Sequence, residues 1–95
     1  MRMKIIRKKN NDGSVSLSLI GEFNIYTVRK LKDLLEKEID GAARVNLDLA
    51  GVTGFDSAGY QLMEYASMVA TKRNGALELE NKGGEVSKLY ALFGN

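Results

Sequence analysis

Hydrophobic and polar positions alternate at the start of the chain, which is the pattern of a strand with one buried face. In the first such segment the hydrophobic positions are Met1, Met3 and Ile5, and in the second they are Val15, Leu17 and Leu19. Residues 10–13 between them read Asn-Asn-Asp-Gly, and an Asp-Gly pair adopts the positive φ angles of a tight hairpin turn. The sequence therefore predicts an antiparallel hairpin whose second strand is interrupted at Gly21.

From Asn24 onward the hydrophobic period becomes that of a helix. The apolar positions of this segment are Val28, Leu31, Leu34, Leu35 and Ile39, and charged residues cover its other side. An Asn side chain accepts a hydrogen bond from an unpaired N–H of a first helical turn, and Gly commonly ends a helix. We therefore expect a first helix with Asn24 as its N-cap and Gly41 as its C-terminal stop.

A third strand follows, because Val45, Leu47 and Leu49 again alternate with polar residues. Residues 51–55 contain two glycines, and we expect them to form a loop. A second helix should begin near Ser57 with Asp56 as its N-cap, and residues 74–75, Asn-Gly, should end it. Its predicted apolar face consists of Ala58, Leu62, Tyr65, Ala66 and Val69.

Leu77 and Leu79 predict a fourth strand. After residues 83–84, which are both Gly, a third helix is predicted by four residues at helical spacing, namely Val86, Leu89, Tyr90 and Phe93. Crossover helices after the second and third strands make their pairings parallel and right-handed. We therefore expect one α/β domain over residues 1–95, with a mixed four-stranded sheet that is mostly parallel, one antiparallel edge strand and about three helices.

The composition narrows the possible functions. With 95 residues, of which 44% are hydrophobic, the chain can bury one modest core. It contains no Cys and no His, and so lacks a thiolate nucleophile, the usual general base at neutral pH and the commonest metal ligands. We expect a protein that is not an enzyme. Since neither a membrane-spanning run nor a signal-peptide pattern is present, we also expect a cytoplasmic location.

Basic residues are concentrated near the N-terminus, although the net charge is only +2. The cluster consists of Arg2, Lys4, Arg7, Lys8 and Lys9. It could attract a nucleic acid or a membrane surface, or it could protect an exposed edge strand from pairing with other chains. No aromatic residue lies in this segment and no second basic patch accompanies it, so we favour protection and expect neither direct nucleic-acid binding nor membrane insertion.

Residues 50–59, AGVTGFDSAG, join the carboxyl end of a buried strand to a helix, where function usually gathers in α/β sheets. Gly54 and Gly59 have the spacing that begins a P-loop, but Tyr60 and Gln61 follow where Lys and Ser or Thr are needed, which excludes nucleotide hydrolysis. Asp48 and Asp56 could share a magnesium ion. Without a third acid we favour a solvated strand-end residue for Asp48 and a helix cap for Asp56.

Ser57 places a hydroxyl in the first turn of a predicted helix, near unpaired N–H groups and the positive end of the helix dipole. The domain would tolerate a phosphate at this position. A phosphate adds about −1.5 to −2 charges beside Asp56, which would repel a protein packed over this part of the surface. Taken alone, Asp-Ser at a helix start is usually just a cap.

Two segments, LSLIGEFNIYTVRKLKDLL and VNLDLAGVTGFDSAGYQLM, resemble the STAS domain, the sulphate-transporter and anti-sigma-factor-antagonist family. Residues 21–24 match a Gly-Glu-Leu-Asp-like turn of that family, and residues 56–59 match its Asp-Ser-Ser-Gly motif. Ala58 replaces the commoner second hydroxyl, and Tyr60 stands where a small aliphatic residue is more usual. The resemblance implies a STAS-like fold that lacks the usual C-terminal strand and helix.

The resemblance further implies an anti-sigma factor antagonist that binds an anti-sigma factor. This anti-sigma factor would itself be a serine kinase of GHKL type, the histidine-kinase-like ATPase class. Phosphorylation of Ser57 would release the antagonist and a cognate phosphatase would reset it, with no cofactor or metal. The implied partner-binding residues are Glu22, Phe23, Asn24, Asp56, Ser57, Ala58, Gly59, Tyr60 and Met63. The alternative is a STAS-domain subunit of a transporter or signalling scaffold, in which Ser57 is only a cap.

Overall fold

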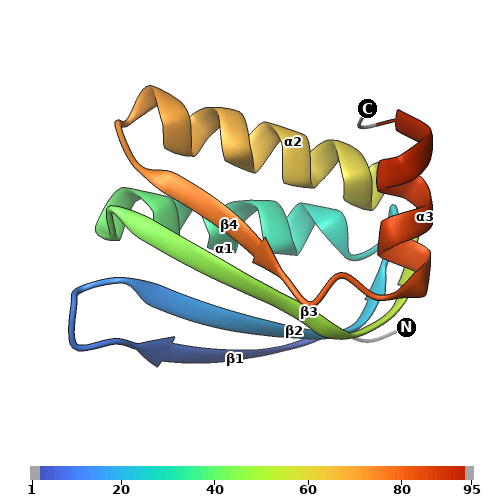
Figure 1. Ribbon diagram of the computed structural model, residues 1–95, viewed down its shortest axis with the longest axis horizontal. Helices are drawn as coiled ribbons and strands as arrows, with labels where there is room; N and C mark the ends of the chain where they lie inside the picture. Colours follow the sequence, from blue (N-terminus) through green and yellow to red (C-terminus); the bar gives the residue numbers. More distant parts are fainter. Residues whose placement is uncertain (1–2, 94–95) are drawn as a thin grey trace.

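Four strands form one mixed sheet in the computed structural model, which describes residues 3–93 (Figure 1). The strands lie in the order β1 (Met3–Lys9), β2 (Val15–Phe23), β3 (Arg44–Phe55) and β4 (Ala76–Glu80). β1 pairs with β2 antiparallel, while β2, β3 and β4 are parallel to one another. This confirms the predicted sheet and its antiparallel edge strand. Met1 and Arg2, which belong to the predicted first strand and basic cluster, lie outside the described residues.

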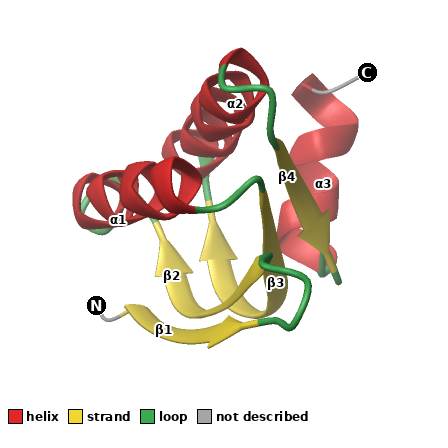
Figure 2. Ribbon diagram, turned by 90° about the vertical axis from the view of Figure 1, so that its left-hand side faces the viewer, coloured by secondary structure: helices red, strands yellow, loops and turns green. Residues whose placement is uncertain are grey.

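The three helices cover one face and one end of the sheet. α1 (Val28–Gly41) and α2 (Ser57–Lys72) lie on the same face, as Figure 2 shows, and α3 (Gly84–Phe93) packs at the end where β3 finishes. Alternate strand residues point toward α1 and α2 and form the core with apolar residues of the helices. The largest fully buried side chains are Phe23, Leu17, Leu19, Leu31, Leu35, Leu47, Leu49, Met63, Val45 and Val86. The opposite face of the sheet carries no helix in the described part of the chain.

Strand β3 is longer than predicted. Residues 51–55 do not form a loop but extend β3 to Phe55, where it pairs with Phe23 of β2. β2 also continues past Gly21, which adopts a φ of 115° beside a shift in the pairing register. The sequence predicted an interruption in β2 and a loop at the end of β3, but these two segments pair with each other. Both strands therefore finish at the same end of the sheet.

Helix α1 begins at Val28 and not after Asn24. The side-chain oxygen of Asn24 accepts a hydrogen bond from the N–H of Tyr26 at 2.9 Å, which forms a local turn instead of a helix cap. Thr27 occupies the N-cap position without a side-chain cap bond. Its hydroxyl instead donates to the backbone carbonyl of Glu22 at 2.8 Å. The predicted N-cap was therefore wrong, because the polar side chains before α1 form hydrogen bonds within their own turn and not with the first turn of the helix.

The buried face of α2 differs from the predicted one. Leu62 and Ala66 are buried as expected, whereas Ala58, Tyr65 and Val69 are only half-buried. The other buried residues of α2 are Gly59, Met63 and Ala70. The helix therefore lies on the sheet along a stripe through Gly59, Met63, Ala66 and Ala70, and its Ala58–Tyr65 side faces α1.

Candidate functional site

The parallel pairing of β2 and β3 brings the two sequence motifs together. Phe23 and Phe55, the last residues of these strands, are register partners, and the N–H of Asp56 donates to the carbonyl of Phe23 at 3.3 Å. The segment after β2 and the start of α2 consequently share one part of the surface. We call this surface the Ser57 corner, and it consists of Asn24, Ile25, Tyr26, Asp56, Ser57 and Ala58.

Asp56 caps helix α2, as predicted. Its backbone is extended, and its Oδ1 accepts hydrogen bonds from the N–H groups of Ala58 at 3.0 Å and Gly59 at 3.3 Å. Ser57 is exposed, and its hydroxyl has no hydrogen-bond partner among residues 3–93. The capping function therefore belongs to Asp56, and the hydroxyl of Ser57 faces solvent.

A short polar network holds the segment between β2 and α1. The hydroxyl of Thr27 accepts from the N–H of Asn24 at 3.0 Å, and the Asn24 amide donates to the Glu22 carboxylate at 3.2 Å. This turn leaves the side chains of Ile25 and Tyr26 68% and 80% exposed. Neither residue was predicted to lie at the site, although two consecutive large apolar residues that fit neither a strand nor a helix period were a usable signal.

Three residues that the resemblance assigned to partner binding are buried. Phe23 is 0% exposed and Met63 is 1% exposed, and both belong to the core. Gly59 is also buried, and a Cβ at this position would lie 2.9 Å from the Phe55 ring and 3.0 Å from the Cβ of Phe23. Direct contact with a partner was therefore the wrong expectation for these side chains. They seat the first turn of α2 on the sheet, which fixes where Ser57 projects.

Tyr60 packs mainly against α3. Its ring lies edge-on to Tyr90 with centroids 4.9 Å apart, and 5.4 Å from the ring of Phe93. Burial raises the pKa of Tyr90 to about 12, with smaller contributions from the charges of Glu64 and Tyr60. Phe93 and its neighbour Leu92 are exposed. Tyr60 thus links the start of α2 to a second exposed apolar region.

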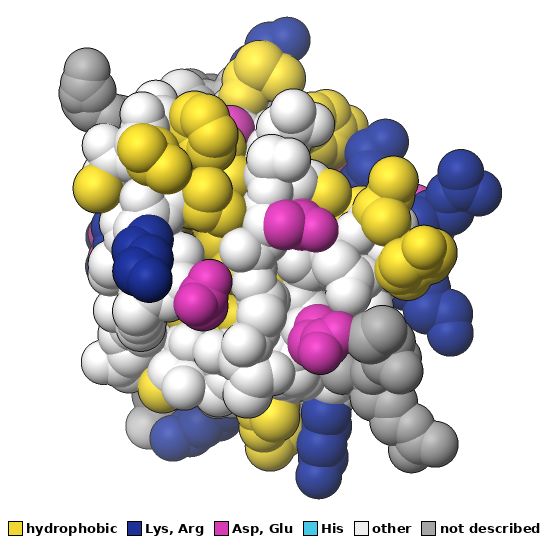
Figure 3. All heavy atoms as spheres, turned by 90° about the vertical axis from the view of Figure 1, so that its right-hand side faces the viewer, with side chains coloured by type: hydrophobic (Ala, Val, Ile, Leu, Met, Phe, Trp, Pro, Cys, Tyr) yellow, Lys and Arg dark blue, Asp and Glu magenta, His cyan; other side chains and the backbone are white. Residues whose placement is uncertain are grey.

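Figure 3 shows the end of the molecule at which α3 lies and α1 and α2 begin. Hydrophobic side chains gather on two sides of this face, with acidic side chains between them. Ile25 and Tyr26 belong to the exposed hydrophobic residues of this end, as do Leu92 and Phe93. Exposed apolar patches with polar residues at their borders are typical of a surface that another protein covers.

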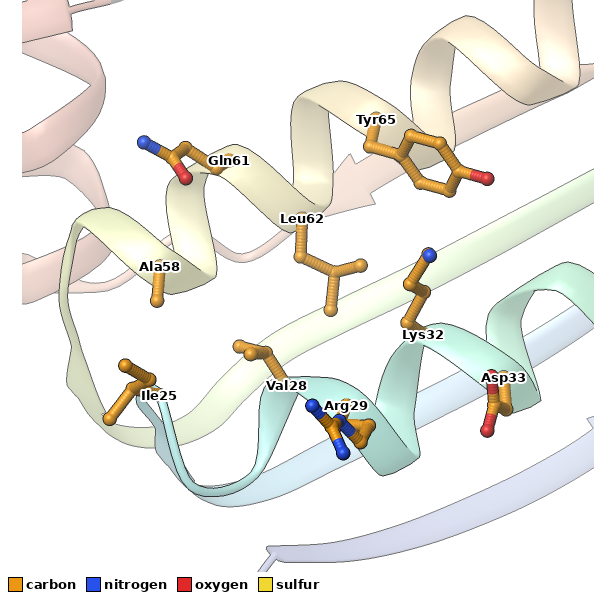
Figure 4. Close-up of a pocket in the computed structure, with 9 residues that line it drawn as sticks. All are labelled: Ile25, Val28, Arg29, Lys32, Asp33, Ala58, Gln61, Leu62 and Tyr65. Atoms are coloured by element: carbon orange, nitrogen blue, oxygen red, sulfur yellow. The ribbon is translucent and has the colours of Figure 1, made fainter.

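A groove between α1 and α2 begins at the Ser57 corner (Figure 4). Ile25 and Ala58 lie at one end of the groove and Tyr65 at the other, around a volume of about 700 Å³. The remaining lining residues are Val28, Arg29, Lys32, Asp33, Gln61 and Leu62. The Tyr65 hydroxyl donates to the carboxylate of Glu36, which raises the pKa of Tyr65. We call this the interhelical groove, and it extends the exposed apolar surface beside Ser57.

Comparison with known proteins identifies the family. The family model described as "Mlab, STAS domain" matches residues 6–95. The chain belongs to the STAS domain family. This STAS domain is 24% identical over 86 residues to the anti-sigma-B factor antagonist of Bacillus subtilis (strain 168), and the match covers 90% of this chain and 79% of that protein.

Solved structures share the STAS fold of this chain. The anti-sigma factor antagonist SpoIIAA in its unphosphorylated form matches with a TM-score of 0.82 and 17% identity, covering 96% of this chain and 81% of that one. An anti-sigma factor antagonist from Mycobacterium paratuberculosis matches with a TM-score of 0.85 and 19% identity, covering 98% and 79%. The phosphorylated form of the Bacillus protein SpoIIAA gives 0.78 and 16%, covering 96% and 84%. The expected STAS-like architecture is therefore confirmed.

The acidic residues of this STAS domain do not form a metal site within the described residues. No group of three or more His, Cys, Asp or Glu side chains is arranged to hold an ion between residues 3 and 93. Asp48 instead accepts hydrogen bonds from the N–H of Ala50 and the amide of Asn81, both at 3.0 Å, which lowers its pKa. Over the same residues, every helix is too short or too polar to cross a bilayer.

Proposed function

We propose that this STAS domain is an anti-sigma factor antagonist whose binding to its partner is switched off by phosphorylation of Ser57. The partner would be an anti-sigma factor that is also a serine kinase of GHKL type, and a phosphatase would remove the phosphate. The observation that carries the proposal is the exposed Ser57 hydroxyl, beside the exposed Ile25 and Tyr26. The similarity of this chain to a protein named an anti-sigma-B factor antagonist supports the choice of partner.

The local geometry indicates why a phosphate would act on the complex and leave the fold intact. The Asp56 carboxylate already accepts the N–H groups of Ala58 and Gly59. A phosphate on Ser57 would therefore remain in solvent next to this carboxylate and add about −1.5 to −2 charges. A partner covering the corner would have to desolvate both anions. A loss of about 2.8 kcal/mol in binding free energy weakens affinity about a hundredfold, which is sufficient for an off switch.

The proposed docking surface combines the Ser57 corner with the interhelical groove. Exposed Ile25 and Tyr26 would supply the apolar anchor, and Asn24, Asp56 and Ala58 would lie around the phosphorylated position. Glu22 and Tyr60 would border this surface, whereas Phe23, Gly59 and Met63 position it from below. The domain would act in the cytoplasm, by binding alone. The phosphate would come from ATP, which would be a substrate of the partner kinase.

Affinity purification from the native host with Ser57→Ala and Ser57→Asp variants tests the proposal. Ser57→Ala should retain a GHKL-type kinase, identified by mass spectrometry, and Ser57→Asp should lose it. Ser67→Asp is the matched control, because Ser67 is also exposed on α2 but lies outside the corner. Equal recovery of the kinase with both Ser57 variants would contradict the switch. A transporter component recovered equally by both variants, with no phosphate on Ser57, would support the alternative of a transporter or scaffold subunit.

A further inference from the structure

Strand β1 is an edge strand, and alternate backbone groups along it point away from the sheet. No strand lies on its outer side in the described part of the chain. The N–H of Asn10 donates to the carbonyl of Ser14 at 2.9 Å, and Lys9 is the register partner of Val15. Because hydrogen-bonded and non-bonded pairs alternate in an antiparallel ladder, residues 4, 6 and 8 bond to β2. The N–H and C=O groups of residues 3, 5, 7 and 9 therefore face outward, ready to pair with another strand.

An apolar groove runs beside this edge, between β1 and α1. In Figure 2, α1 lies above β1. Met3, Ile5 and Leu34 are half-buried in the groove, which encloses about 520 Å³. The other lining residues are Tyr26, Thr27, Lys30 and Leu31. Since Met3 and Ile5 point to the helix side of the sheet, the side chains on the same face of an added strand would enter this groove. The edge thus offers both main-chain pairing and an apolar pocket.

The opposite face of β1 selects the charge of the occupant. Lys4 and Lys8 are exposed there, on either side of Ile6, which is 49% exposed. Their register partners on β2 are the uncharged Ile20 and Ser16. The strand contains no acidic residue. Pairing of two β1 strands from separate copies would bring lysines together, whereas acidic residues on an added strand would pair with them favourably.

We propose that the outer edge of β1 binds an extended acidic segment of another protein, which adds to the sheet as a further strand. Alternate apolar side chains of the segment would fill the groove between β1 and α1, and the acidic ones would face Lys4 and Lys8. Strand addition of this kind draws affinity from the main chain and specificity from alternate side chains. The site shares only Tyr26 with the Ser57 corner, so it goes beyond the proposed function and stands independently of it.

A direct test uses a fluorescein-labelled octapeptide of alternating Val and Glu and measures fluorescence anisotropy with the whole chain. The wild type should bind this peptide and reject the matching Val-Lys peptide. The Lys4→Glu/Lys8→Glu variant should bind the Val-Glu peptide at least about tenfold more weakly and gain affinity for the Val-Lys peptide. Ser57→Asp should leave peptide affinity unchanged, which separates this site from the phosphorylation switch. Absence of Val-Glu binding by the wild type, or a preference for Val-Glu over Val-Lys that the charge reversal leaves unchanged, would overturn the proposal.

Amide hydrogen exchange distinguishes strand addition from loose electrostatic attraction. On binding the Val-Glu peptide, the outward N–H groups of Ile5 and Arg7 should exchange at least about tenfold more slowly. Leu34→Glu should prevent binding by placing a charge in the groove, whereas Lys37→Glu, the same charge on an exposed position of α1, should not. Binding without slowed exchange at Ile5 and Arg7 would refute the added strand. Self-association of the wild type that slows exchange at Ile5 and Arg7 in the absence of peptide would point to a second copy as the occupant and likewise overturn the proposal.

Discussion

Replacing Gly59 by Ala should destabilise the domain although Ala is the better helix former. The new Cβ would lie 2.9 and 3.0 Å from two carbons of the Phe55 ring and 3.0 Å from the Cβ of Phe23. Ordinary carbon contacts are about 3.5–4.0 Å. Phe55 has little room to move, because its ring stacks on Phe23 at 5.6 Å and on Tyr90 at 6.4 Å. We expect overpacking to cost about 3 kcal/mol, offset by about 1 kcal/mol of helix propensity.

The net loss of about 2 kcal/mol should lower the melting temperature by roughly 8–16 °C for a domain of this size. Urea unfolding followed by circular dichroism measures the free energy of unfolding. Gly41→Ala in α1 is the matched control, because a Cβ at Gly41 meets nothing within 4 Å, and it should leave stability unchanged or raise it slightly. A Gly59→Ala variant as stable as the wild type would show that α2 is not seated tightly on Phe23 and Phe55. The fixed position of Ser57 would then lose its basis.

Three further predictions concern the same end of the molecule. Asp56→Ala removes both cap bonds of α2 and should reduce the free energy of urea unfolding by about 1 kcal/mol. Ser57→Ala and Ser57→Asp should each change that free energy by less than about 0.5 kcal/mol, because the hydroxyl has no hydrogen-bond partner in the described structure; a larger loss would assign Ser57 a structural role. The pKa of Tyr90 is raised from 10.0 to about 12, so the hydroxyl loses its proton at a higher pH in the folded state than in the unfolded state. The free energy of unfolding should therefore fall as pH rises from about 10 to about 12. Because the Tyr90 side chain is partly exposed, this loss is on the order of 1 kcal/mol. In urea unfolding, the Tyr90→Phe variant should lose less of its free energy of unfolding over this pH range than the wild type.

The order and type of the elements followed from local signals. Alternation of period two predicted the strands, and the helical period predicted α1 and α2, because each element buries one face on the same core. Residues 51–55 were misjudged because two glycines and a threonine are common in loops. Their strand conformation depends on pairing with β2, a contact between segments far apart in the sequence. No local pattern carries that information.

The candidate site was predictable in part. The Asp56 cap involves residues within one helical turn, so the sequence was sufficient to predict it. The burial of Phe23 and Met63 was not predictable from the motif, since adjacency to Ser57 in the sequence says nothing about the direction in which a side chain points. The exposure of Ile25 and Tyr26 depends on the hydrogen bonds of one irregular turn. Side-chain direction at irregular turns was thus the main information that only the structure supplied.

Phosphorylation of the purified domain by the kinase that co-purifies with it tests the central claim most directly. The two proteins would be incubated with ATP, the modified residue mapped by mass spectrometry, and the Kd measured by calorimetry before and after modification. We expect phosphate on Ser57 and a Kd weakened about a hundredfold, with unchanged circular dichroism. Phosphate on Ser57 with an unchanged Kd, or modification only at another residue, would contradict the account.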